Sequence, residues 1–95
     1  MIIKGIISYR MSDSSSKSEG YRACLTDMEG KIYKLYRAGR LAYMDEFFLP
    51  FDGKELRLSG TYEEVTDDFL VESVILEDGT EIPAEGDEEE NEQIN

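Results

Sequence analysis

The chain has 95 residues, of which 40% are hydrophobic, and this content suits one small domain while excluding a second core. It has no histidine and one cysteine, Cys24, so it forms no intramolecular disulfide and has too few thiolates for a cysteine-based zinc site. The net charge of −12 argues against nucleic acids and anionic membranes as partners, because like charges repel.

Residues 2–11 alternate between apolar and polar side chains with the period of a β-strand. Ile6 is an apolar exception on the outward side. This apolar start lacks the basic lead and small-residue cleavage site of a signal peptide, and no apolar run approaches the roughly 18 residues of a membrane-spanning helix. We therefore expect a cytoplasmic protein without membrane contact. The inward side of this strand would carry Ile3, Gly5, Ile7 and Tyr9.

Residues 12–20 are polar and rich in serine without any periodicity, which predicts a flexible loop. Residues 21–27 and 31–37 then flank a three-residue connection, 28–30, that ends in glycine. Such a connection is typical of a β-hairpin, so the second and third strands are expected to pair. Their inward face would hold Ala23, Leu25, Tyr33 and Leu35.

From residue 38 the alternation fails, and large apolar side chains recur instead at three- and four-residue spacings. This spacing predicts one or two turns of helix over 41–48, which Pro50 cannot continue. The residues that carry the pattern are Leu41, Tyr43, Met44, Phe47 and Phe48.

Residues 55–62 alternate again, and Gly60 within them predicts a bend or bulge. Residues 69–76 are dense in aliphatic and β-branched side chains, which predicts a strand covered on both sides, and 80–83 form a short extension. Residues 84–95 contain too few apolar side chains to offset the entropy of ordering, so we expect a disordered acidic tail.

Three strands, a short helix and two further strands make an order that resembles the OB-fold, a small five-stranded Greek-key barrel. Residues 56–61 and 69–74 resemble the closing strands of many of its members, and the resemblance covers residues 2–77. It implies an all-β domain with one short helix over residues 1–83. The alternative is an SH3-like barrel, which would place a single 3₁₀ turn where the helix is expected.

The charge distribution allows an anionic ligand in spite of the net charge. All ten basic residues precede position 58, where eight acidic residues accompany them, so the first 57 residues carry +2. OB-folds commonly bind oligonucleotides or oligosaccharides on the face of strands two and three and in the adjacent loops. The alternative interpretation of this face is a solvated surface with no ligand. The candidate ligand-binding residues are Arg22, Lys34, Tyr36, Arg37 and Arg40.

Aromatic side chains cluster in residues 43–51. The simplest interpretation is a plug for one end of the barrel, because a small domain has few apolar side chains for its core. If part of the cluster stays exposed, it marks a protein-binding patch, since large apolar patches are uncommon on monomers. The candidate protein-contact residues are Tyr43, Phe47, Phe48 and Phe51.

The acidic tail carries six acids within residues 85–95. A barrel with a basic leading half and an acidic tail is similar in layout to the single-stranded-DNA-binding proteins of bacteria and phages, whose tails compete with DNA. Those tails end in a hydrophobic tip, whereas this chain ends Gln93-Ile94-Asn95. A tail that only improves solubility is the simpler interpretation.

These features predict a binding module rather than an enzyme, because the chain lacks the histidine that most often transfers protons near neutral pH. We expect no cofactor and no metal. The leading hypothesis is a protein-interaction or adaptor domain with an unidentified protein partner. One alternative is single-stranded nucleic-acid binding with an autoinhibitory tail, and another is an acidic inhibitor or immunity protein.

Overall fold

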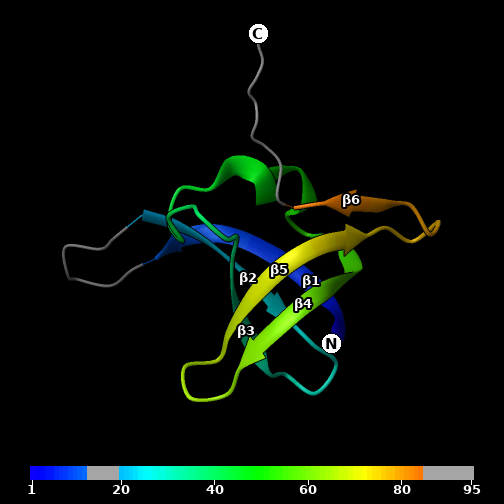
Figure 1. Ribbon diagram of the computed structural model, residues 1–95, viewed down its shortest axis with the longest axis horizontal. Helices are drawn as coiled ribbons and strands as arrows, with labels where there is room; N and C mark the ends of the chain where they lie inside the picture. The colour runs from blue at the N-terminus through cyan, green and yellow to red at the C-terminus, as the bar shows by residue number, and fades with distance from the viewer. Residues whose placement is uncertain (13–19, 85–95) are drawn as a thin grey trace, which may run out of the picture.

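The computed structural model describes residues 1–12 and 20–84 of the chain (Figure 1). The tip of the predicted flexible loop, 13–19, and the tail from 85 to 95 lie outside the described residues. Each predicted strand is confirmed in place. The elements are β1 (Ile2–Ser12), β2 (Gly20–Thr26), β3 (Ile32–Tyr36), the 3₁₀ helix η1 (Glu46–Phe51), β4 (Glu55–Glu63), β5 (Asp68–Ile75) and β6 (Glu81–Pro83).

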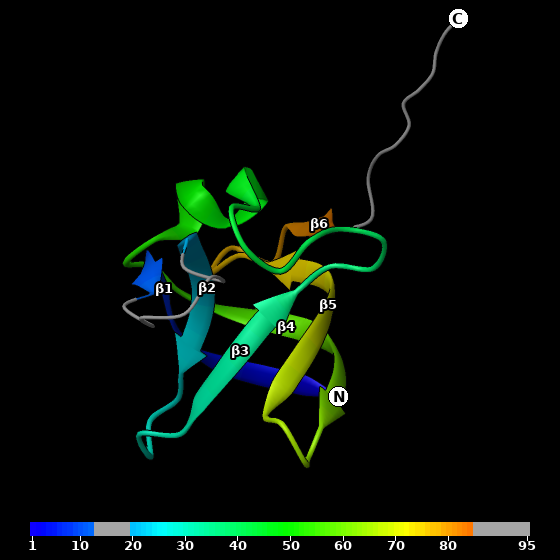
Figure 2. The same cartoon turned by 90° about the vertical axis from the view of Figure 1, so that its left-hand side faces the viewer.

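The five long strands close into a barrel. β1 pairs antiparallel with β2 through residues 6–12 and with β4 through residues 2–6. β3 pairs antiparallel with β2 and parallel with β5, and β5 pairs antiparallel with β4 (Figures 1 and 2). The order around the barrel is therefore β1-β2-β3-β5-β4, while β6 adds to β5 outside it. The all-β class with one short helix is confirmed, and the closed barrel is compatible with an OB-like fold.

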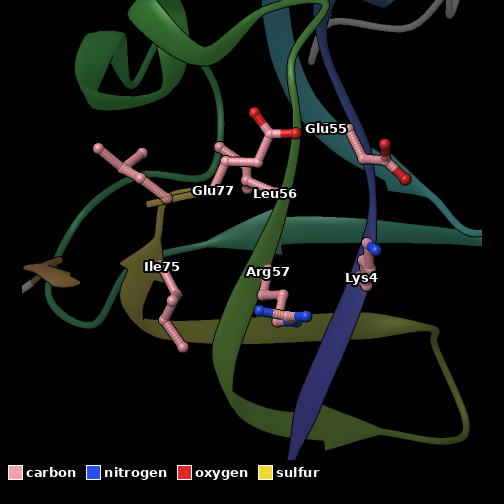
Figure 3. A pocket seen from close by; sticks show the side chains of 7 residues that line it. Lys4, Glu55, Leu56, Arg57, Ile75 and Glu77 are labelled. Atoms are coloured by element: carbon pink, nitrogen blue, oxygen red, sulfur yellow. The ribbon is translucent and has the colours of Figure 1, made fainter. Parts of the chain in front are cut away.

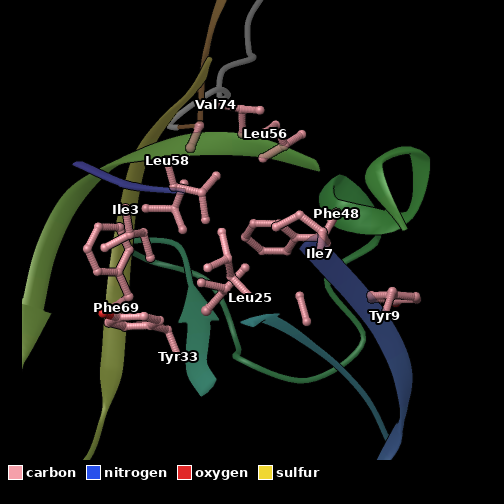
Figure 4. Packing of buried hydrophobic residues seen from close by; sticks show 14 residues of the cluster. Ile3, Ile7, Tyr9, Leu25, Tyr33, Phe48, Leu56, Leu58, Phe69 and Val74 are labelled. Carbon is pink, nitrogen blue, oxygen red and sulfur yellow. The ribbon is translucent and has the colours of Figure 1, made fainter. Parts of the chain in front are cut away.

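The inward faces predicted from the alternation are confirmed. Hydrophobic side chains from all five barrel strands and from η1 meet in one core (Figure 4). Ile6 points outward, as its position in the alternation requires, and is 52% exposed. The core consists of Ile3, Ile7, Tyr9, Ala23, Leu25, Tyr33, Leu35, Phe48, Leu56, Leu58, Phe69, Val71, Val74 and Ala84.

Gly60 lies at a β-bulge, which confirms the prediction. Ser59 pairs with Ser73 and Gly60 pairs with Val71, so Glu72 is an extra residue on β5. A Cβ atom at position 60 would overlap a carbonyl oxygen of the β5 backbone. Only glycine fits this close approach of two strands.

The prediction that the last long strand is covered on both sides is wrong. Val71 and Val74 point into the core, but Glu72 between them is exposed, and Leu70 and Ile75 are only partly buried. Because the bulge inserts one residue, the alternation of β5 shifts by one position. The strand therefore has one inward-facing stretch before the bulge and another after it, and the two together make the sequence dense in apolar residues without burial of both faces.

The helix between β3 and β4 begins later than predicted and is of the 3₁₀ type. It spans Glu46–Phe51 instead of 41–48, and Asp45 caps it by accepting a hydrogen bond from the Phe47 N–H at 3.2 Å. Pro50 lies inside it, contrary to the prediction. A proline lacks only one donor, and a single 3₁₀ segment of this length depends on few i→i+3 hydrogen bonds.

The plug predicted for one end of the barrel is formed by η1. Phe48 is 1% exposed and reaches the core beside Ile7 (Figure 4). Phe47 and Phe51 are partly buried and pack against this core. A single 3₁₀ segment here was the expectation for the SH3-like alternative. The 3₁₀ segment therefore does not favour the OB-like fold, and the compatibility with that fold comes from the order in which the strands close the barrel.

Candidate functional site

The connection from β3 to η1 forms a groove that unites two predicted sites. Two candidate ligand-binding residues, Arg37 and Arg40, line it together with two candidate protein-contact residues, Tyr43 and Phe47. Its volume is about 550 Å³. We call it the β3–η1 groove; its remaining lining residues are Gly39, Leu41, Met44, Asp45 and Glu46.

Two large apolar side chains of the β3–η1 groove are open to solvent. Leu41 is 83% exposed and Met44 is 59% exposed, whereas Tyr43 and Phe47 are half-buried. The Phe47 ring contacts the Phe48 ring edge-on, with 5.2 Å between the ring centres. We call the two half-buried aromatic side chains the floor of the groove and the two exposed apolar side chains its rim.

Two hydrogen bonds hold the rim of the groove against β2, one between backbone groups and one from the backbone to the Met44 side chain. The Met44 N–H donates to the Tyr21 carbonyl at 2.7 Å, and the Tyr21 N–H donates to the Met44 sulfur at 3.3 Å. One further β-bridge joins Arg22 to Tyr43. Met44 has a φ of 63°, in the left-handed region that non-glycine residues rarely adopt. These contacts explain why residues 41–45 do not form the predicted helix.

Arg37 is buried, and each of the three nitrogens of its guanidinium donates a hydrogen bond within the protein. Nε and Nη2 donate to the two carboxylate oxygens of Asp45 at 2.8 and 2.6 Å, and Nη1 donates to the Ala84 carbonyl at 2.7 Å. The group also lies 4.4 Å from the centre of the Phe47 ring. Ala84, which the sequence analysis assigned to the tail, is buried with the core. In this arrangement Arg37 fixes the wall of the groove and is held by acceptors of the protein itself.

The other predicted ligand-binding residues lie on the outer face of β2 and β3. Arg22 forms an ion pair with Asp68 at 3.3 Å, and its guanidinium carbon lies 5.3 Å from the centre of the Tyr43 ring. The Arg22 Nε atom is buried without a hydrogen-bond partner. Lys34 is exposed and Tyr36 is half-buried. Arg22 thus connects this strand face to the β3–η1 groove through Tyr43.

Cys24 is half-buried on β2, where it pairs with Lys34 of β3 and follows Arg22 by two positions. Burial raises the pKa of its thiol, and the two nearby cations lower it by less. The thiol therefore stays protonated near neutral pH, unlike the thiolate that nucleophilic cysteines require.

The adjacent acids Asp67 and Asp68 have separate partners. Asp67 accepts hydrogen bonds from the Tyr62 hydroxyl at 2.6 Å and from Lys31 Nζ at 3.2 Å, and these bonds lower the pKa of its carboxyl group. Asp68 accepts from Arg22. Across residues 1–12 and 20–84, no group of three or more cysteines and acids is placed to hold a metal ion.

Comparison with models of protein families, with curated proteins and with solved structures finds no match to this chain. In the part of the chain that the structure describes, no helix is long and apolar enough to cross a membrane. We therefore assign the candidate site from the geometry of the barrel alone, without a related protein of known function.

Sequence reasoning missed the exposed rim of the groove. The spacing of Leu41 and Met44 fits a helical period and predicted a helix over 41–48, and Met44 also lies in the segment 43–51 that was interpreted as a plug. Gly39 shortly before them, at φ 75°, was the available signal for a loop. Their exposure follows from the hydrogen bonds between Met44 and Tyr21, which no local sequence pattern predicts.

Proposed function

We propose that the protein is a non-enzymatic binding module with an OB-like barrel, and that the β3–η1 groove binds a segment of a partner protein. The observation that carries this proposal is the exposure of Leu41 and Met44 at the rim of a groove with an aromatic floor. Burying such side chains against a partner is favourable, and methionine adapts its shape to different apolar surfaces.

The charges of the groove favour a peptide over a polyanion. Asp45 and Glu46 line the groove together with Arg37 and Arg40, and Asp45 already neutralises Arg37. A phosphate backbone would meet both of these acids. A peptide with apolar side chains needs no net positive charge, since its affinity comes from buried contacts at the centre of the interface.

Selection of peptides on the full chain tests the proposal directly. A random peptide display library is panned on the protein, and the selected peptides are labelled and titrated by fluorescence anisotropy. The variant Leu41→Ser changes a rim side chain that is 83% exposed and should weaken binding at least tenfold. Met28→Ser, in the β2–β3 turn where Met28 is 87% exposed, is the matched control and should bind like the unchanged protein.

Two results would contradict a peptide-binding groove. One is that no peptide is enriched over panning on an unrelated protein. The other is that the selected peptides bind the groove variant and the Met28→Ser control with equal affinity. The midpoint of urea unfolding, measured for both variants, shows that a loss of binding does not come from unfolding.

Single-stranded nucleic acid is the second candidate ligand. It is supported by the Arg22 guanidinium stacked on the Tyr43 ring beside the exposed Lys34, since single strands bind to combinations of cations and aromatic rings. A labelled oligothymidylate should then bind at low salt, weaken as salt rises, and bind more tightly when residues 85–95 are deleted. Absence of binding by the truncated protein at low salt would rule this candidate out.

A further inference from the structure

The outer face of β1 and its neighbours carries an unusual set of exposed isoleucines. Ile2 is 59%, Ile6 is 52% and Ile32 is 54% exposed. Ile6 pairs with Thr26 and Thr26 pairs with Ile32, so Ile6, Thr26 and Ile32 form one row across β1, β2 and β3, while Ile2 lies four positions before Ile6 on β1. We call Ile2, Ile6 and Ile32 the isoleucine face. It includes the start of β3, whereas the β3–η1 groove follows the end of that strand.

Charged residues of both signs lie next to the isoleucine face. Lys4, between Ile2 and Ile6 on β1, pairs with Arg57 on β4, and Ile6 pairs with Glu55. Figure 3 shows Lys4 and Arg57 side by side on neighbouring strands, with Glu55 above them. Like charges directly opposite each other on a sheet destabilise the pairing. None of the ion pairs found among the described residues includes Lys4, Glu55 or Arg57.

The pattern of charges is complementary to itself. Along β4, Glu55 stands one row above Arg57, and both side chains are exposed. Consider a two-fold axis that lies in the plane of the face, runs perpendicular to the strands and passes between these two rows. Rotation by a half-turn about this axis places Glu55 of one copy opposite Arg57 of the other. The operation creates this contact twice, as in any two-fold interface. It also sets the apolar stem of Lys4 over Ile6 of the second copy.

We infer that the isoleucine face binds a second copy of this chain, with Glu55 of each copy paired to Arg57 of the other. Such an interface covers exposed apolar surface and supplies each arginine with an acid that its own barrel does not provide. A partner that carries charges of one sign only would pair with Glu55 or with the Lys4 and Arg57 row, but not with both. This inference concerns a surface separate from the groove and does not depend on the proposed peptide binding.

A charge swap on the full chain tests the pairing. Sedimentation equilibrium over a range of concentrations should give twice the monomer mass of 10.9 kDa for the unchanged protein. Glu55→Arg and Arg57→Glu each place like charges opposite one another and should weaken association at least tenfold. The double variant Glu55→Arg/Arg57→Glu restores opposite charges across the two-fold axis and should associate like the unchanged protein.

Apolar variants test the same face. Ile6→Asp should give a monomer, whereas Val65→Asp, in the β4–β5 turn where Val65 is 88% exposed, should leave the association unchanged. A single mass of 10.9 kDa at every concentration of the unchanged protein would refute the inference and leave the face to another partner. Failure of the double charge variant to recover association would refute the Glu55–Arg57 pairing.

Discussion

Replacing Arg37 with methionine should destabilise the barrel by about 3–5 kcal/mol, the cost of leaving a buried charge without its partner. The side chains of Arg37 and Asp45 are only 9% and 6% exposed, so water is a poor replacement for the lost hydrogen bonds. Asp45 would keep only the weaker bond from the Phe47 N–H, and the Ala84 carbonyl would lose its donor from Arg37. A domain of this size has a total stability of about 5–14 kcal/mol, so the loss is a large part of it.

Urea unfolding monitored by circular dichroism measures this loss. With a slope of roughly 1.3 kcal/mol per molar urea, a loss of about 4 kcal/mol lowers the unfolding midpoint by about 3 M. Arg10→Met is the matched control, because Arg10 is exposed on β1. It should change the stability by no more than about 0.5 kcal/mol.

A double variant separates the buried charge from the loss of packing. Arg37→Met/Asp45→Asn removes both charges but keeps an oxygen that accepts the Phe47 N–H, so it should recover at least half of the stability lost in Arg37→Met. A loss below about 1 kcal/mol in Arg37→Met would refute the reasoning. A double variant no more stable than Arg37→Met would equally refute it, because the unpaired Asp45 would then not be the source of the loss.

Two further changes test other parts of the barrel. Gly60→Ala should cost about 3 kcal/mol or more, since its Cβ meets the carbonyl oxygen of Leu70 in the backbone, and the urea midpoint measures this against Ser59→Ala as control. Tyr62→Phe should raise the pKa of Asp67 toward its ordinary value of 3.8, measured by carbon NMR of the carboxyl group. Because the folded pKa of Asp67 is depressed, its contribution to stability is present above pH 3.8 and is lost as the pH falls through the folded value. An unchanged titration in Tyr62→Phe would contradict the role of that hydroxyl.

The sequence predicted the strands well because their signal is local. Each predicted end lies within one residue of the observed strand, since alternation with a period of two depends only on neighbouring positions. The hairpin between β2 and β3 followed from Gly30, which has a φ of 88°. The position of Gly60 at a bulge likewise followed from the weak strand propensity of glycine.

The candidate site was predicted only in part, because burial of a charged or aromatic side chain depends on distant segments. Arg37 was assigned to an exposed face, but its donors reach Asp45 and Ala84, which is 47 positions away. Phe48 was named as a possible contact residue and is instead in the core. Arg40 and Tyr43 do line the groove, next to an exposed Leu41 that its spacing had assigned to a helix.

The sequence alone determined the all-β class, the inward faces and the sites of the sharp turns, because these depend on local periodicity and on backbone sterics. The tertiary structure decided which strands meet and which apolar side chains stay exposed. The parallel pairing of β3 with β5 joins Leu35 to Phe69, and no local pattern specifies such a contact. The groove forms for the same reason, since Met44 lies beside Tyr21 only after the barrel has closed.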